Sequence, residues 1–77
     1  MRIDLHGYHI HEGWRKFKRE IDDAYLNNYK RVTVITGQGA MMKELPTWAD
    51  NHPRIREVKQ PHKHNPGSFT IILTKKT

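Results

Sequence analysis

The 77-residue chain contains no cysteine, which excludes a disulfide framework, a thiolate zinc site and a catalytic thiol. No apolar run approaches the roughly 20 residues needed to span a bilayer, and the first residues lack the apolar core of a secretion signal. We therefore expect a cytoplasmic protein with no membrane partner. Because only 35% of the residues are hydrophobic, the chain can form one small core, and we treat residues 1–77 as a single domain.

Acidic residues are outnumbered by basic ones. Lys and Arg number 14 against 8 Asp and Glu, which gives a formal charge of +6 at pH 7. An excess of this size suits an anionic partner, with nucleic acid as the first candidate. It is also a common way to keep a small domain soluble, so charge alone leaves nucleic-acid binding open.

Four segments have the composition of strands. Residues 2–6 alternate polar and apolar side chains, and residues 31–35 are rich in β-branched side chains. Residues 54–59 form a weaker candidate, and residues 68–74 place three apolar side chains on one face. Between these last two strands, residues 60–67 have the Pro, His, Lys and Gly content of a long, mobile, basic hairpin loop.

Two segments are predicted to be helical. The first carries apolar residues in steps of three and four on one stripe, and it is expected to end at Asn27-Asn28. Its stripe consists of Ile10, Trp14, Phe17, Ile21 and Tyr25. The second covers residues 40–51, where Pro46 predicts either a kinked helix or a short turn followed by a helix from near Leu45.

The element order is therefore βαβαββ, which predicts an α/β fold of the two-layer α+β sandwich type. We expect a four-stranded mixed sheet with two helices packed on one face. A strand, helix, strand unit of this length normally makes a right-handed crossover between parallel strands. Gly7 and Gly37 should then lie at the same edge of the sheet, so the turns that contain them are expected to be neighbours.

The best candidate for catalysis is the run Asp4-Leu5-His6-Gly7. Asp4 and His6 are two residues apart on a predicted strand, so their side chains leave the same face with Cα atoms roughly 6.6 Å apart. A carboxylate beside an imidazole orients the ring and favours its protonated form, which suits a general acid in phosphodiester cleavage. The ordinary alternative is a solvent-facing pair that caps nearby backbone.

A second candidate is the glycine turn that precedes the second helix. Gly37 and Gly39 flank Gln38, and the absence of side chains lets backbone N–H groups approach an anion at a helix amino terminus. Lys43 follows and adds a positive charge. The alternative is a tight turn without a ligand, and the spacing does not match that of a nucleotide-binding P-loop.

Metal and stacking sites are weakly supported by the sequence. The spacing of the six histidines does not match a zinc site, so we predict no dedicated metal site; a weakly held Mg²⁺ or Mn²⁺ on Asp4 stays open. The spacing of Trp14, Phe17 and Trp48 within helices favours core packing over base stacking. Tyr8, beside the proposed site, is the better stacking candidate.

In combination, these motifs resemble the Smr (small MutS-related) domain family over nearly the whole chain. The run from Asp4 to Gly7 resembles the family's DLHG signature, and the run Ile35-Thr36-Gly37-Gln38-Gly39 resembles its second, HGxG or TGxG, signature. Leu45-Pro46, Trp48, His52-Pro53 and Gly67 also stand at familial positions. The resemblance implies a fold similar to the C-terminal domain of the third translation initiation factor, and endonuclease activity on RNA or DNA.

The resemblance places Asp4 and His6 in the catalytic position, and Gly37 and Gly39 beside the scissile phosphate. One departure matters, because Thr36 stands where many members have a histidine. Its hydroxyl can hydrogen-bond a phosphate oxygen but cannot shuttle protons at neutral pH. By the same resemblance, ribosomes or the machinery of DNA repair and recombination are the implied partners.

These inferences predict an endonuclease that cleaves RNA or DNA with Asp4 and His6 as its acid/base pair. The alternative is a catalytically inactive nucleic-acid-binding module that grips phosphates with the same loops. In either case, four basic side chains around the glycine turns and the basic loop are expected to bind nucleic acid. They are Lys43, Arg54, Lys59 and Lys63.

Overall fold

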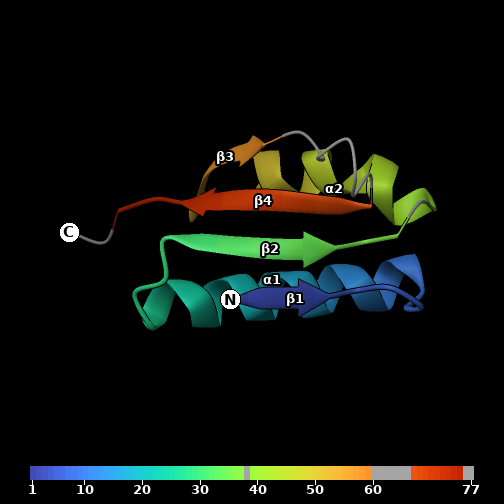
Figure 1. Ribbon diagram of the computed structural model, residues 1–77, viewed down its shortest axis with the longest axis horizontal. Helices are drawn as coiled ribbons and strands as arrows, with labels where there is room; N and C mark the ends of the chain where they lie inside the picture. The colour runs from blue at the N-terminus through green and yellow to red at the C-terminus, as the bar shows by residue number, and fades with distance from the viewer. Residues whose placement is uncertain (38, 60–66, 76–77) are drawn as a thin grey trace.

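The structure, a computed structural model, describes residues 1–37, 39–59 and 67–75. Figure 1 shows the elements in the predicted order, so the βαβαββ prediction is confirmed. In chain order they are β1 (Arg2–Asp4), α1 (Ile10–Leu26), β2 (Arg31–Ile35), α2 (Ala40–Asp50), β3 (Ile55–Lys59) and β4 (Ser68–Leu73).

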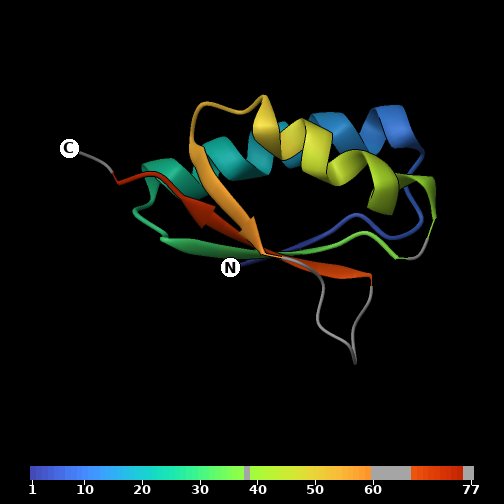
Figure 2. The same ribbon diagram turned by 90° about the horizontal axis from the view of Figure 1, so that it is seen from above.

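The four strands form one mixed sheet in the order β1-β2-β4-β3. β1 pairs with β2 in parallel, whereas β4 pairs antiparallel with both β2 and β3. Both helices lie on one face of this sheet and leave the other face open, as Figure 2 shows. The predicted two-layer architecture is therefore confirmed. No helix in the described part of the chain is long and apolar enough to cross a membrane.

The core lies between the helices and the covered face of the sheet. Alternate residues of β1, β2 and β4 point into it, because successive side chains of a strand leave opposite faces. Its largest fully buried side chains are Phe17, Ile3, Leu5, Ile21, Leu45, Ile71, Val32 and Val34. Trp48 packs against this core at its edge, as predicted, with its ring centroid 5.9 Å from that of Phe17. The same prediction is wrong for Trp14, which lies outside the core with the Lys18 ammonium 3.6 Å from its ring centre.

α1 buries a slightly different stripe from the predicted one. Gly13 and Ala24 are buried together with Phe17 and Ile21. Ile10, the first residue of the helix, is instead 43% exposed and lies outside the core. Gly13 is buried because α2 packs against it: a Cβ at this position would lie 2.5 Å from Sδ of Met41. Gly13 thus lets the two helices approach closely.

The predicted end of α1 is confirmed. Asn28 adopts a left-handed conformation with φ of 66°, which asparagine tolerates better than most residues. The backbone N–H groups of Asn28 and Tyr29 donate to the carbonyls of Tyr25 and Ala24 at 3.1 and 3.0 Å. This Schellman pattern satisfies two carbonyls at the helix end and directs the chain into β2.

α2 continues through Pro46 as one helix from Ala40 to Asp50. The alternative of a turn followed by a helix from Leu45 is therefore wrong. Pro46 removes one N–H donor, the one that would bond to the carbonyl of Met42, and the buried stripe compensates for this loss. That stripe comprises Met41, Leu45 and Ala49.

His52 is a buried polar residue that follows α2 and faces α1. Its side chain is 7% exposed, and Nε2 lies 3.5 Å from Oδ1 of Asp22. Nδ1 accepts a hydrogen bond from the Arg54 backbone N–H at 3.2 Å. Burial lowers the pKa of His52 below its usual value, and this effect outweighs the opposing attraction of Asp22.

The lowered pKa of His52 predicts that acid destabilises the fold. The unfolded chain takes up a proton near pH 6.5, whereas folded His52 resists it, so stability is full above about pH 6.5 and falls as the pH drops below it. We expect the melting temperature to fall between pH 7.5 and 5.0, and to fall less in His52→Gln. Thermal melts across this range, with exposed His11→Gln as a control that should follow the parent, check it. Parallel profiles for His52→Gln and the parent would contradict it.

Candidate active site

The turns that follow β1 and β2 meet at one end of the sheet, as the parallel pairing predicts (Figure 1). The pairing of the chain with β2 continues one residue past β1, because the Leu5 N–H donates to the Ile35 carbonyl at 2.7 Å. A Cβ at Gly37 would lie 3.2 Å from Cδ2 of His6, so the imidazole packs directly against this glycine. The expectation that the two glycine-bearing turns are neighbours is thus confirmed.

β1 is shorter than predicted because the chain turns immediately after Leu5. The Tyr8 N–H donates to the Leu5 carbonyl at 3.2 Å, and Gly7, with φ of 88°, supplies the left-handed residue of this turn. Leu5 is fully buried, whereas Asp4 and His6 are exposed, so the alternation of the strand continues into the turn. It leaves both candidate catalytic side chains in solvent.

Asp4 supports the turn that carries His6. Its Oδ1 accepts a hydrogen bond from the backbone N–H of His6 at 2.9 Å. Within the described residues, its carboxylate forms no ion pair with the imidazole. The expected carboxylate–imidazole contact is therefore absent from this part of the chain, and the ring of His6 is positioned by Gly37 instead. The second carboxylate oxygen of Asp4 has no protein partner among these residues.

Thr36 and Gly37 join β2 to the start of β4. The carbonyl of Gly67 accepts hydrogen bonds from the N–H groups of Thr36 at 2.7 Å and Gly37 at 3.2 Å. The Thr36 hydroxyl lies 3.2 Å from the same carbonyl and 2.8 Å from that of Gly37. Thr36 is 4% exposed. These donors therefore have acceptors within the protein, and the phosphate contact of Thr36 and Gly37 stays a prediction.

Gly39 differs from Gly37 because the space around it is open. It is the residue before α2, with φ of −112°, and a Cβ there would meet nothing within 4 Å. In the described part of the chain, the N–H groups of Ala40 and Met41 have no hydrogen-bond acceptor. Lys43 is exposed near the start of the same helix. Gln38, also predicted to bind phosphate, lies outside the described residues.

The other residues predicted to contact nucleic acid are not grouped together in the structure. Tyr8 is 44% exposed beside His6, with the Lys16 ammonium 5.6 Å from its ring centre. Lys59 is exposed at the end of β3, and Lys63 lies outside the described residues. The structure does not bring Arg54 to the glycine turns.

Arg54 lies at the opposite end of the sheet from Gly37. Its backbone carbonyl accepts the N–H of Thr74, which follows β4, at 2.8 Å. Its guanidinium is 3.3 Å from Oδ1 of Asp22 and 4.2 Å from the ring centre of Tyr25. The sequence places Arg54 near His52 but gives no signal for this ion pair, because Asp22 is 32 positions away in the chain.

The candidate site offers few ligands for a metal ion. Across residues 1–37, 39–59 and 67–75, no three His, Asp or Glu side chains are grouped as metal ligands. Asp4 is a single carboxylate, and one of its oxygens already accepts the His6 N–H. These residues do not form a dedicated Mg²⁺ or Mn²⁺ site, and we derive no step through a metal.

Sequence reasoning missed the part played by Gly67. A Cβ on this residue would lie 2.8 Å from both Cα and the carbonyl carbon of Gly37. The backbones of β4 and the second glycine turn therefore touch at Gly67, directly behind the residue that positions His6. A glycine immediately before a predicted strand is the available signal, since glycine at such a position often marks close backbone approach.

The fold and this paired-turn site define a class of small two-layer α+β domains. The family model of the Smr domain matches residues 3–75, and the chain belongs to this family. Among curated relatives, Endonuclease MutS2 of Shouchella clausii (strain KSM-K16) is 34% identical over 59 residues, 74% of this chain. Endonuclease MutS2 of Staphylococcus epidermidis (strain ATCC 12228) is 29% identical over 73 residues. The chain spans 8% and 9% of the lengths of these relatives.

Two solved structures share the fold. The crystal structure of the Smr domain of Thermus thermophilus MutS2 aligns with a TM-score of 0.89 and 13% identity, covering 96% of this chain and 98% of that one. YdaL, a stand-alone small MutS-related protein from Escherichia coli, aligns with a TM-score of 0.80 and 18% identity, covering 96% and 64%. At these identities the likeness establishes the fold.

Proposed function

We propose that the chain binds nucleic acid and cleaves phosphodiester bonds beside His6, as an endonuclease acting on RNA or DNA. The observation that carries this proposal is the packing of the His6 ring on Gly37. This contact puts an exposed imidazole two residues from the open amino terminus of α2. Membership of the Smr family, whose matched relatives are named as MutS2 endonucleases, supports the same reaction class. Ribosomal or DNA-repair assemblies are the partners that we propose on the family resemblance.

The amino terminus of α2 is the proposed phosphate site. Its first N–H groups, on Ala40 and Met41, have no acceptor among the described residues and carry the positive end of the helix dipole. Gly39 leaves the space in front of them open, and Lys43 adds a positive charge. A phosphate oxygen bound there would place the phosphorus near the imidazole of His6.

His6 and Asp4 divide the proton transfers in this proposal. In RNA, the 2′-oxygen bonds to phosphorus while the bond to the 5′-oxygen breaks, so one group takes the 2′-hydroxyl proton and another gives a proton to the leaving oxygen. The imidazole of His6 and the unengaged oxygen of Asp4 can serve in these two roles. In DNA, which lacks the 2′-hydroxyl, a water molecule must attack instead.

The second candidate function is a binding module without catalysis. The observation that favours it is the buried Thr36, whose hydroxyl is bonded to two carbonyls. It adds no second imidazole to the site, so a mechanism that needs two histidines is incomplete in this chain. The same open helix terminus would then hold phosphate without cleaving it.

Incubation with end-labelled RNA and DNA, with and without Mg²⁺, separates these functions. Cleavage of either substrate supports the endonuclease if the activity copurifies with the protein and is lost in a His6 variant. Salt-sensitive binding without cleavage supports the binding module. The absence of both binding and cleavage would contradict both functions.

The two glycines of the second turn provide a finer test of the phosphate site. Gly39→Ala adds a methyl group in open space at a permitted φ, so its stability cost is below about 1 kcal/mol, yet the methyl group would obstruct the phosphate. We expect this variant to melt within a few degrees of the parent and to lose most cleavage. Parallel melts and cleavage assays measure both effects.

Gly37→Ala is the matched comparison. Its φ of 74° strains a residue with a Cβ, and that Cβ would press on the ring of His6. This variant should therefore lose stability and activity together. If Gly39→Ala also loses both in proportion, the turn is structural and the phosphate assignment is wrong.

A further inference from the structure

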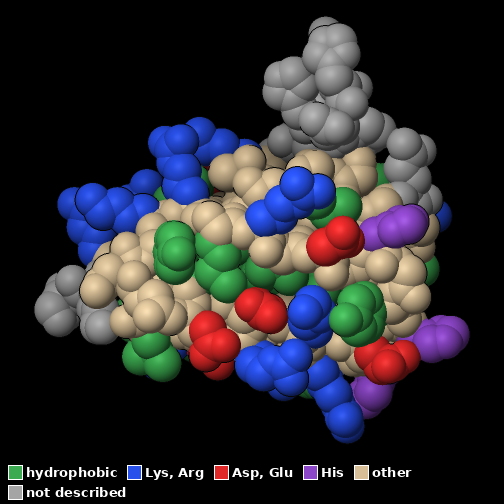
Figure 3. All heavy atoms as spheres, turned by 60° about the horizontal axis from the view of Figure 1, so that its bottom comes forward, with side chains coloured by type: hydrophobic (Ala, Val, Ile, Leu, Met, Phe, Trp, Pro, Cys, Tyr) green, Lys and Arg blue, Asp and Glu red, His purple; other side chains and the backbone are tan. Residues whose placement is uncertain are grey.

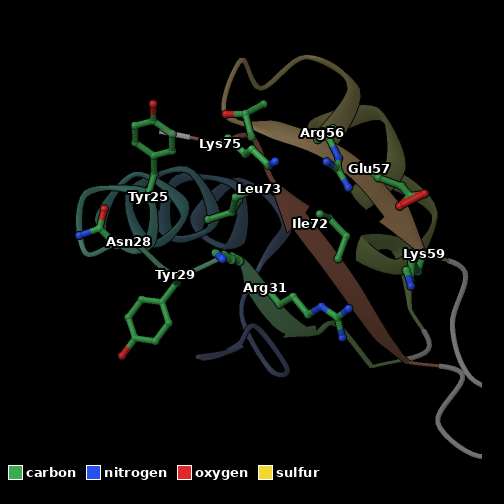
Figure 4. Close-up of a pocket in the computed structure, with 12 residues that line it drawn as sticks. Tyr25, Asn28, Tyr29, Arg31, Arg56, Glu57, Lys59, Ile72, Leu73 and Lys75 are labelled. Carbon is green, nitrogen blue, oxygen red and sulfur yellow. The ribbon is translucent and has the colours of Figure 1, made fainter. Parts of the chain in front are cut away.

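A basic hollow surrounds the end of β4 and opens onto the uncovered face of the sheet at Ile72 (Figure 4). It has a volume of about 600 Å³. It lies away from the candidate active site, because Arg31 begins β2 whereas Gly37 follows its end. The residues that line it come from the end of α1, from β2, from β3 and from β4. They include Tyr29, Arg31, Arg56, Lys59, Ile72 and Lys75.

The charge of this hollow is strongly one-sided. Five cations line it, including Lys30, against the single carboxylate of Glu57. All five are exposed, and none forms an ion pair with another described residue. By contrast, Arg54 and Lys16 are paired with Asp22 and Glu20. In Figure 3, one group of Lys and Arg side chains gathers at the end of the molecule away from the histidines. Unpaired cations at this density favour an anionic ligand.

The floor of the hollow is apolar. Ile72 faces outward between Arg31 and Glu57 in the strand register, yet it is only 9% exposed. Figure 4 shows Arg31 and Arg56 on either side of it. Two guanidinium groups over an apolar floor suit a phosphate held by paired N–H donors, with its sugar against the aliphatic surface. Tyr29, 48% exposed at the rim, offers a face on which a base can stack.

The outward side chains between this hollow and the active site form a basic and polar path. The next row across the sheet contains Arg2, Thr33, Thr70 and Lys59, which are paired in register. The row after it contains Asp4, whose neighbour His6 packs on Gly37. From Arg31 to Ile35 this path is about 13 Å long.

We propose that the open sheet face, entered at the Arg31–Arg56 hollow, binds a single-stranded segment of nucleic acid and leads it to His6. This inference rests on the binding half of the proposed function and adds the form and path of the substrate. The face does not suit the groove of a duplex. The outer strands of a four-stranded sheet are about 14 Å apart, wider than the roughly 12 Å of a major groove.

The test measures binding of a fluorescein-labelled 12-nucleotide single strand, as RNA and as DNA, between 50 and 200 mM salt. The test variant is Arg31→Gln with Arg56→Gln, and the control is Arg15→Gln with Arg19→Gln on the exposed face of α1. Both remove two guanidinium charges and keep part of each side-chain stem. The aliphatic part of Arg31 covers Ile72, so replacing Arg31 could alter packing as well as charge. A second test variant, Arg56→Gln with Lys59→Gln, therefore leaves Arg31 in place. Thermal melts check that each variant is folded. All proteins carry His6→Ala so that the probe stays intact.

We expect both test variants to weaken binding about fivefold or more at 50 mM salt. The slope of log affinity against log salt should become shallower by about 1.4, since each phosphate contact on a single strand contributes about 0.7. The α1 control should keep the slope of its His6→Ala reference, and a 12-base-pair duplex should bind more weakly than the single strand. An unchanged slope in the test variants, or a duplex preference, would overturn this inference alone. No binding by the reference protein would overturn it together with the proposed function.

Discussion

His6→Ala is expected to lower the rate of phosphodiester cleavage by about 10²- to 10⁴-fold, the usual contribution of a group that transfers a proton in the transition state. His6 is exposed, so its removal leaves no cavity in the core and should change the melting temperature little. Binding should persist, because the proposed phosphate site uses the backbone of α2 and the Arg31–Arg56 hollow lies at the other end of β2. Single-turnover cleavage of the labelled substrate, beside a binding titration and a melt, measures the three quantities.

Two further variants separate proton transfer from mere disturbance of the turn. His11→Ala removes another exposed histidine, from the first turns of α1, and should cleave like the parent. Asp4→Asn keeps an oxygen that can accept the His6 N–H but removes the charge, so it should retain the fold and lose cleavage if the carboxylate transfers a proton. If His6→Ala and the parent cleave equally at matched purity, the activity belongs to a contaminant and the binding module is favoured.

Most of the fold could be predicted from local patterns. The alternation in residues 2–6 and 31–35, with a helix between them, implies a parallel pair, and this pairing brings Gly37 to His6. The Asn27-Asn28 terminus was also predictable, since asparagine tolerates the left-handed conformation. These features depend on residues close together in the chain or on a general rule of handedness.

Features that depend on distant partners were not predictable. The backbone N–H of Thr36 donates to the carbonyl of Gly67, 31 positions away, and the Thr36 hydroxyl lies between this carbonyl and that of Gly37. Asp4 was expected to orient the His6 ring, yet its carboxylate accepts the nearer backbone N–H. A sequence shows which donors and acceptors exist but not which of them find partners inside the fold.

The unpaired cations on the open sheet face also could not be identified from the sequence. Arg31 and Arg56 are unremarkable in the sequence, where Arg54 is an equally good candidate. Strand order puts β4 between β2 and β3, which brings Arg31 and Arg56 to opposite sides of Ile72. Arg54 instead pairs with Asp22. The distinction between a free and a neutralised arginine therefore required the tertiary structure.

Gly67→Ala is expected to destabilise the domain more than any other single methyl addition discussed above. The new Cβ would lie 2.8 Å from Cα and the carbonyl carbon of Gly37 and 3.0 Å from its oxygen. These are backbone atoms, which cannot rotate away as the end of a side chain can. Relief of this clash requires β4 to move away from the second glycine turn. That movement weakens the hydrogen bonds from Thr36 and Gly37 to the Gly67 carbonyl.

Overpacking of this kind costs about 1–3 kcal/mol, and in a domain of this size each kcal/mol lowers the melting temperature by roughly 4–8 °C. We therefore expect Gly67→Ala to melt about 5–20 °C below the parent. Gly39→Ala, with the same added methyl group in open space, is the matched control and should melt within a few degrees of the parent. Cleavage measured well below the melting point should also fall, because displacement of Gly37 moves the surface on which His6 packs. A Gly67→Ala protein that melts with the parent would show that β4 and the second glycine turn do not touch, and the placement of His6 would then need another cause.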